Sequence, residues 1–205
     1  MGVLEVGDEQ SDEGIITALI ERWRPETHII HMRTGEFTIT LQDIEVLCDI
    51  PIDSDPLVQA GVRQISKSRW RELMFELTGW LSEEGSIKGN SLLRIKALSK
   101  HVEILDDIDD DTDEIVVQQR VRLYLHWLFG GTIFPDNTGA LLSLDFLLDI
   151  RDLDAMGRKA WGAAALSYLY NSLCHASMWN SREFHYYVVP FSLTVLFNWK
   201  NISII

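Results

Sequence analysis

The sequence has few cysteines, few prolines and few basic residues, and it lacks a long apolar run. Its 205 residues include two cysteines, Cys48 and Cys174, which do not form a Cys-x-x-Cys pair. This pattern argues against a disulfide framework and favours a reducing compartment. The acidic start lacks the apolar segment of a signal peptide. Val6 stands where a myristoylation signal requires Ser or Thr.

The most apolar stretch is residues 184–198, which is too short for a membrane span. A spanning helix needs about 18 or more consecutive apolar residues, and this stretch also contains Pro190. We therefore expect no transmembrane helix and no membrane partner.

Positive charge is scarce, with 18 Lys and Arg against 31 Asp and Glu and a net charge of −13. A surface that binds nucleic acid needs clustered basic residues, so this balance argues against nucleic-acid binding by the chain alone. The segment Arg63–Arg71 still holds four basic residues. A transposon-derived nucleic-acid-binding module therefore stays open as the alternative function.

Apolar residues make up 46% of the chain and charged residues 24%, which is typical of a globular protein. We predict an acidic flexible leader over 1–12 and one mainly helical (α+β) domain over 13–177. Apolar spacing of three and four residues predicts helices over 13–23, 41–48, 67–80, 91–105, 114–128, 143–149 and 155–177.

One small antiparallel hairpin is predicted near the N-terminus. Pro25 ends the first helix, and His28–Met32 and Phe37–Leu41 have the pattern of two strands. The segment Arg33–Glu36 suits a tight turn, with a pairing of its first and last residues across the turn. Thr40 then suits the cap of the helix that follows.

The helix over 114–128 has a set of apolar residues that we expect to face the core. Gly130 and Gly131 are expected to end this helix, as glycine does at helix C-termini. The inward set is Val117, Val121, Tyr124, Leu125 and Leu128.

The sequence contains no recognisable catalytic or metal-binding motif. His28 and His31 are three apart, which places them on opposite faces of a strand. The acidic run around 106–114 fails the EF-hand pattern in both registers tried, because glycine and glutamate are missing from the required positions. A pyridoxal enzyme would need a larger α/β frame and a Schiff-base lysine. We expect no catalytic residue, no cofactor and no metal, hence not an enzyme.

A polar cluster precedes the last predicted helix. Asp154 and Arg158 are spaced i,i+4 with the acid first, which favours an ion pair on a helix. Asp154 also suits the cap of the helix over 155–177. We expect this cluster, with Arg151 and Asp152, to be partly buried and paired. Its role is structural or a contact with a ligand or partner.

Three stretches together resemble the plant mobile domain family. They are ALIERWRPETHIIHMRTGEFTITLQDIEVLCDIPIDSDPLV at 18–58, LYLHWLFGGTIFPDNTG at 123–139 and LLDIRDLDAMGRKAWGAAALSYLYNSLCHAS at 147–177. Their order and spacing also match the family. After Ser177 the family pattern continues with an apolar helix, which residues 178–205 do not follow. We interpret this segment as an atypical tail, either truncated or from a mispredicted exon.

The resemblance implies a non-enzymatic interaction module that acts in nuclear silencing of transposable elements, genome stability and meristem maintenance. It also implies a partnership with a plant phosphatase-like protein of the seven-type long form. The label "aminotransferase-like", which accompanies the family, gains no support from these residues. We predict a nuclear location from the resemblance alone.

The hairpin is interpreted as a clamp onto the helical body, with partner recognition along its exposed edge as the rival interpretation. The candidate structural or partner-contact residues, chosen from positions that match the family and from the polar cluster, are Trp23, Arg24, Pro25, Glu26, His28, Gly35, Arg151, Asp152, Asp154, Arg158 and Trp161.

Overall fold

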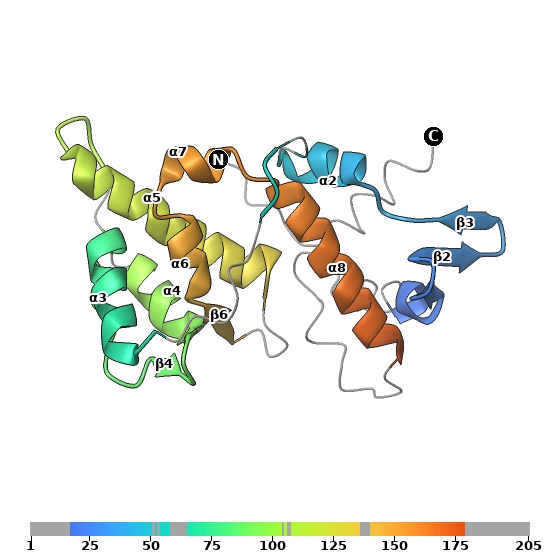
Figure 1. Cartoon of the computed structure of the whole chain (residues 1–205), viewed down its shortest axis with the longest axis horizontal. Coiled ribbons are helices and arrows are strands. Elements are labelled where there is room, and N and C mark those ends of the chain that lie inside the picture. Colours follow the sequence, from blue (N-terminus) through green and yellow to red (C-terminus); the bar gives the residue numbers. More distant parts are fainter. Residues whose placement is uncertain are drawn as a thin grey trace. The chain divides into compact units, whose positions relative to one another are not determined.

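The fold is mainly helical with two small antiparallel sheets, as the predicted fold class requires (Figure 1). A computed structural model describes residues 17–50, 52, 54–57, 65–103, 105, 108–135 and 140–178. The chain divides into two compact units. The first comprises Met1–Ile52 with Gly162–Ile205, and the second comprises Asp53–Trp161. The predicted leader 1–12 and nearly all of the tail 178–205 lie outside the described residues.

The first unit contains the predicted hairpin, enlarged to a sheet of three strands. Strands β1 (Trp23–Arg24), β2 (Ile29–Met32) and β3 (Gly35–Phe37) pair in that order. Trp23 was expected at the end of the first helix, but the described helical residues end at 21. Its place in β1 corrects that prediction, because the chain becomes extended ahead of Pro25.

The hairpin turn is shorter than predicted, and a different pair of polar side chains is in contact beside it. Met32 pairs with Gly35, so only Arg33 and Thr34 form the loop. Glu36 lies opposite His31, and their side chains are in contact, with 3.1 Å between Oε1 and Nδ1. The expected pairing of Arg33 with Glu36 is replaced by this cross-strand pair, which the antiparallel register brings together.

The helix after the hairpin begins at the predicted cap. In α2 (Leu41–Cys48), the Thr40 side chain accepts a hydrogen bond from the Asp43 backbone, and the Asp43 carboxylate accepts one from the Thr40 backbone. This reciprocal capping box satisfies two backbone donors that the helix itself leaves unpaired. It also fixes the residue at which the chain leaves the sheet and α2 begins.

The second unit contains the helices α3 (Lys67–Thr78), α4 (Ile95–Glu103), α5 (Glu114–Leu128), α6 (Asp145–Asp149) and α7 (Leu153–Gly157). It also contains a sheet that the apolar pattern of the sequence does not predict. The strands are β4 (Ile87–Lys88), β5 (Leu92–Arg94) and β6 (Leu141–Ser143), in that order.

The helix predicted over 91–105 is therefore wrong at its start. Leu92–Arg94 pair with β4 on one side and β6 on the other, and Leu93 is fully buried. The periodic stripe begins at Ile95, the residue at which α4 starts. A three-residue strand that leads directly into a helix leaves too few residues for a period-two pattern.

The helix α5 matches its predicted bounds, but the predicted inward face is wrong. Leu123 and His126 are buried, whereas Val121, Tyr124 and Leu128 are 40–46% exposed. The helix has apolar residues on both faces, so periodicity does not tell which face packs. A criterion based on hydrophobicity alone does not place a histidine in the core, so it overlooks the buried His126.

Gly130 and Gly131 do not end the helix, because the chain continues as the π-helical turn η1 (Phe129–Ile133). A Cβ on Gly130 would lie 2.2 Å from the Cβ of Leu142, and one on Gly131 would lie 2.9 Å from Ile95 Cδ1. These glycines therefore allow β6 and α4 to approach the backbone closely. A π-helical turn is rare and marks a local departure from regular packing.

The long helix α8 (Trp161–Met178) begins six residues later than predicted. A separate short helix, α7, precedes it, and Asp152 caps α7 by accepting a hydrogen bond from the Ala155 backbone. The predicted capping role of Asp154 is therefore wrong. Between α7 and α8 the chain is not helical, and Lys159 forms an isolated parallel β-bridge with Asp55.

Candidate functional site

Trp23 is the centre of an aromatic cluster in the first unit. Its side chain is 1% exposed, and its indole N–H donates to Cys174 Sγ at 3.3 Å. The ring centroid of Tyr170 lies 5.4 Å from that of Trp23. Because Tyr170 and Cys174 belong to α8, the strand that contains Trp23 is fixed to this helix.

Two hydrogen bonds extend the cluster to the end of the hairpin. The hydroxyl of Tyr170 donates to the backbone carbonyl of Ile39, and the hydroxyl of Thr38 donates to the carbonyl of His28. Thr38 and Tyr170 hydroxyls lie 3.1 Å apart. The segment between β3 and α2 is thus fixed to α8 by side-chain hydrogen bonds rather than by a strand ladder.

His28 occupies a backbone conformation that few residues other than glycine adopt. Its φ is 54°, and its backbone N–H donates to the Arg24 carbonyl at 2.8 Å. Histidine tolerates this region better than most residues, although at some cost in strain. The exposed imidazole stacks on the Trp23 ring at 5.8 Å and lies tilted against the Tyr170 ring at 4.7 Å. His28 therefore closes the turn that contains Pro25 and covers the cluster.

The other predicted residues of the hairpin face solvent or lie at its end. Arg24 and Glu26 are exposed, and Pro25 is half-buried. The tip of the hairpin, defined as Met32–Glu36, is exposed throughout, and Met32 is 42% exposed. Gly35 has a φ of 148°, with open space where a side chain would be. The base of the hairpin is packed, and its tip offers polar and apolar groups to solvent.

The polar cluster of the second unit is exposed rather than partly buried. Arg151, Asp152, Asp154 and Arg158 all lie at the surface. Within the described part of the second unit, no ion pair joins Asp154 to Arg158. The short α7 ends before a stable i,i+4 pair can form on a continuous helix. The backbone carbonyl of Arg151 instead accepts from Arg122 Nε at 3.2 Å.

Trp161 is the buried member of the predicted set in the second unit. Its ring lies 4.3 Å from Phe129 and 6.3 Å from Phe134, and its indole N–H donates to the Met156 carbonyl at 2.9 Å. Lys159 Nζ lies 6.0 Å from the Trp161 ring and forms a 2.8 Å ion pair with Asp149. The ion pair in this region is thus formed by Lys159 and Asp149, and not by Asp154 and Arg158 as predicted.

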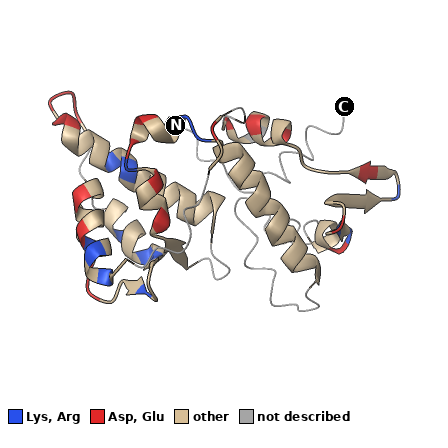
Figure 2. Ribbon diagram, viewed as in Figure 1, with Lys and Arg blue, Asp and Glu red and all other residues tan. Residues whose placement is uncertain are grey.

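The local basic patch considered for nucleic-acid binding is partly neutralised by its surroundings. Arg69 contacts the carboxylates of Glu72 and Glu76 at 3.0 and 3.1 Å, and hydrogen bonds to these carboxylates raise its pKa. Arg71 Nε donates to the Ser82 carbonyl at 3.1 Å. Arg63 lies outside the described residues. Figure 2 shows basic residues in the first part of α3 and acidic residues further along the same helix, which reduces the attraction of this surface for phosphate.

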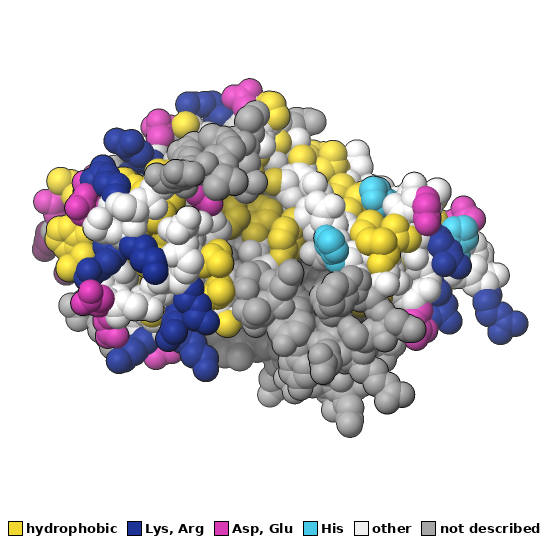
Figure 3. Space-filling model, turned by 60° about the horizontal axis from the view of Figure 1, so that its bottom comes forward, with side chains coloured by type: hydrophobic (Ala, Val, Ile, Leu, Met, Phe, Trp, Pro, Cys, Tyr) yellow, Lys and Arg dark blue, Asp and Glu magenta, His cyan; other side chains and the backbone are white. Residues whose placement is uncertain are grey.

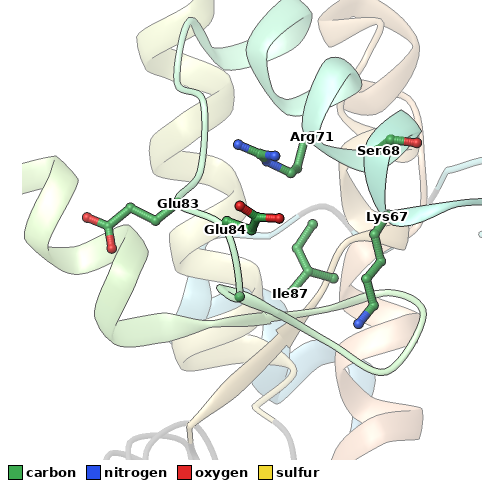
Figure 4. A pocket seen from close by; sticks show the side chains of 7 residues that line it. Lys67, Ser68, Arg71, Glu83, Glu84 and Ile87 are labelled. Atoms are coloured by element: carbon green, nitrogen blue, oxygen red, sulfur yellow. The ribbon is translucent and has the colours of Figure 1, made fainter.

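A shallow cavity of about 350 Å³ lies beside the start of α3. Its lining comprises Lys67, Ser68, Arg71, Glu83, Glu84, Gly85 and Ile87. Figure 4 shows the ends of Lys67 and Glu83 pointing away from each other. A candidate general acid or base must lie within hydrogen-bond reach of a nucleophile. This lining therefore gives no support to hydrolase or transferase chemistry.

No group of three or more metal-ligating side chains occurs within the residues that the structure describes. In the same part of the chain, none of the helices has the length and apolar character needed to cross a bilayer.

Three residues of the cluster in the first unit were not among the predicted candidates: Tyr170, Thr38 and Cys174. Tyr170 and Cys174 lie more than 130 positions from Trp23, and Thr38 lies in the loop after β3. Only tertiary contact relates them to the cluster. The only indication of Tyr170 in the sequence was the near-continuous apolar character of α8, which predicts a buried helix. A tyrosine hydroxyl on such a helix needs a hydrogen-bond partner when it is buried.

The family model of the plant mobile domain matches residues 3–205. This chain belongs to the plant mobile domain family. The resemblance predicted from the three stretches is thereby confirmed. The match includes residues 3–12 of the predicted leader and all of 178–205, the segment predicted to be an atypical tail.

Three relatives from Arabidopsis thaliana illustrate the similarity. "Serine/threonine-protein phosphatase 7 long form homolog" is 32% identical over 203 residues, which cover 99% of this chain and 14% of that protein. "Protein MAIN-LIKE 2" is 35% identical over 167 residues, 82% of this chain and 24% of that protein. "Protein MAINTENANCE OF MERISTEMS" is 32% identical over 172 residues, 84% of this chain and 34% of that protein.

The aligned part of this chain thus spans between 14% and 34% of the length of these relatives. No solved structure matches the chain.

Proposed function

We propose that this plant mobile domain acts as a non-enzymatic interaction module in nuclear silencing of transposable elements, genome stability and meristem maintenance. Its partner is a phosphatase-like protein. Membership of the family supports this proposal. So do two names among its relatives, one of which refers to meristem maintenance and the other to a phosphatase.

The observation that carries the interaction role is the contrast between the two ends of the hairpin. Trp23, Tyr170 and Thr38 fix the base, whereas residues 32–36 are exposed. A contact surface on a rigid support loses little conformational freedom when it binds. Methionine at such a surface adapts to a partner, as Met32 would here.

The strand β3 also has an edge that can accept a partner strand. It forms one side of the three-stranded sheet, and Gly35 and Glu36 on it are exposed. Strand addition at a sheet edge uses backbone hydrogen bonds for affinity and side chains for specificity. With three residues, this edge adds only a few such bonds, so the tip side chains supply the remaining selectivity.

The test is purification of the tagged chain from plant nuclei, followed by mass spectrometry of the proteins that co-purify. We expect a phosphatase-like protein in stoichiometric amount, absent from a purification with the tag alone. Recovery of chaperones only would contradict the proposal. Recovery of the chain from the cytosolic fraction and not from nuclei would contradict the proposed location.

A further inference from the structure

The helix α5 has more exposed apolar residues than any other described element. Six of the twelve exposed large hydrophobic side chains in the described residues belong to it. Hydrophobic side chains lie among charged ones on the face shown in Figure 3. Single exposed apolar residues are ordinary, but a contiguous set on one element indicates an interaction surface.

Four apolar residues of α5 form a regular line, which we call the outer seam. They are Val117, Val121, Tyr124 and Leu128, with spacings of four, three and four residues. Val121, Tyr124 and Leu128 are 40%, 46% and 40% exposed. This spacing is that of the a and d positions of a coiled coil, where apolar residues pack against a second helix.

The face of α5 that packs within the second unit is a different one. Leu123 is 1% exposed, and the Nε2 atom of His126 lies 3.0 Å from the Ser143 carbonyl. On another side, Trp127 donates its indole N–H to Ser99 of α4 at 3.2 Å. Among the described residues the outer seam takes no part in these contacts, so it is available to a second helix.

The two ends of the outer seam have opposite charge. The loop before α5 and its first turn contain Asp109, Asp110, Asp111, Asp113 and Glu114, which are red in Figure 2. The other end lies beside α4: a Cβ on Gly131 would lie 2.9 Å from Ile95 Cδ1, and Lys96 follows Ile95. Lys96 and Lys100 of α4 are exposed.

We propose that the outer seam binds a second copy of this chain, with the two α5 helices antiparallel about a twofold axis between residues 122 and 123. The positions in the outer seam then pair as Val117 with Leu128 and Val121 with Tyr124, so each valine meets a larger side chain. A twofold axis uses the same surface on both copies, which requires this self-complementarity.

The charges favour the same antiparallel orientation. The acidic start of one α5 lies over the end of the other, where Lys96 is exposed. Arg120 of one copy lies near the exposed Trp127 ring of the other, an arrangement that permits a cation–π contact. A parallel pair would instead bring the two acidic starts together and set Val117 against Val117.

The small size of the outer seam sets the expected strength of the dimer. One helical face on each copy gives an interface in the lower size class, below about 1,200 Å² in total, which is typical of transient association. We therefore expect a monomer–dimer equilibrium in the micromolar range. This inference is independent of the proposed nuclear function and of the phosphatase-like partner.

Sedimentation equilibrium of the purified full chain tests the dimer. The wild-type chain is expected to shift from monomer to dimer as its concentration rises. Val121→Lys and Tyr124→Lys each weaken the dimer at least about tenfold, because a lysine ammonium cannot be solvated inside the seam. Phe75→Lys is the control, because Phe75 is 56% exposed on α3 and lies off the seam. A monomer at every concentration overturns the proposal, as does an equal effect of all three substitutions.

The orientation is tested by mixing two single-cysteine variants, Val117→Cys and Leu128→Cys, under mild oxidation, each made in a chain in which the free Cys48 and Cys174 are replaced by serine. Antiparallel pairing predicts a disulfide between positions 117 and 128 in the mixture and none when either variant is alone, as identified by peptide mapping. A disulfide within either variant alone overturns the antiparallel arrangement. This measurement also decides the case if the lysine variants fail to fold.

Discussion

Replacing Trp23 with alanine is expected to lower the free energy of unfolding of the first unit by about 3–5 kcal/mol. Trp23 is 1% exposed, and its ring lies against Tyr170 of α8. Its removal leaves a cavity and deprives Cys174 Sγ of its hydrogen-bond donor. Because domains are stable by only about 5–15 kcal/mol, this loss removes a large share of the stability and raises the population in which the hairpin is open.

Hydrogen exchange of the backbone amides in β2 measures this effect in the first unit, and circular dichroism in denaturant measures the whole chain. Trp23→Phe keeps most of the apolar area but lacks the N–H donor, so its loss should be intermediate. Val46→Ala is the matched control in the same unit, since Val46 is 71% exposed. A loss below about 1 kcal/mol for Trp23→Ala would show that the cluster does not hold the hairpin.

The second large effect is a loss of stability in acid that depends on His126. Burial lowers the pKa of His126 from its usual 6.5 to about 4, and the hydrogen bond to the Ser143 carbonyl opposes this shift only in part. A carbonyl accepts only, so Nε2 must carry the proton in the neutral ring. In the folded state the His126 imidazole therefore stays neutral to a lower pH, whereas in the unfolded chain its pKa has the usual value.

The sign of the pH dependence follows from the order of the two pKa values. Above pH 6.5 the imidazole is neutral in both states. Below that pH the unfolded chain binds a proton that the folded chain excludes, so stability falls until about pH 4, where the folded state is also protonated. The loss over this window is on the order of 3 kcal/mol.

Denaturant unfolding at a series of pH values measures this loss against His126→Gln. Glutamine retains an N–H donor for Ser143 and does not titrate. We expect the stability difference between wild type and variant to shrink as the pH falls from 6.5 to about 4. A constant difference across this range would mean that the buried ring does not titrate as its surroundings predict.

The fold class and the hairpin could be predicted because their signals are local. Pro25, Gly35 and the Thr40–Asp43 pair each fix the backbone within a few residues, and α2 begins where its capping box places it. The second sheet was missed because β4 and β6 comprise two and three residues. Strands of that length have no detectable alternation and form only when tertiary packing supplies their partners.

The packed face of α5 could not be chosen from sequence because two apolar lines run along it. Val121 and Tyr124 have the hydropathy of a core, while His126, which is buried, has that of a surface. The role of Gly130 was also misjudged. Close approach of Leu142, rather than a turn, requires glycine there, and a contact between distant segments leaves no local pattern.

The candidate site was predicted in part. Trp23 and Trp161 were named as structural or partner-contact residues, and both are buried against aromatic side chains. The polar cluster from Arg151 to Arg158 was expected to be partly buried and is exposed, because α7 ends at Gly157 and α8 begins separately. A break of a few residues between two helices separates the expected i,i+4 pair, Asp154 and Arg158. Such a break leaves no mark in the amino-acid composition, so the sequence does not reveal it.

The most direct measurement is the amount of phosphatase-like partner recovered from plant nuclei with a tip variant that contains Met32→Glu and Arg33→Glu. Lys88→Glu, an exposed charge reversal on β4 in the second unit, is the matched control. If the tip of the hairpin is the contact surface, the tip variant stays folded and loses the partner, while the control retains it. Recovery of the partner in full with the tip variant would contradict the claim that the hairpin presents the interaction surface.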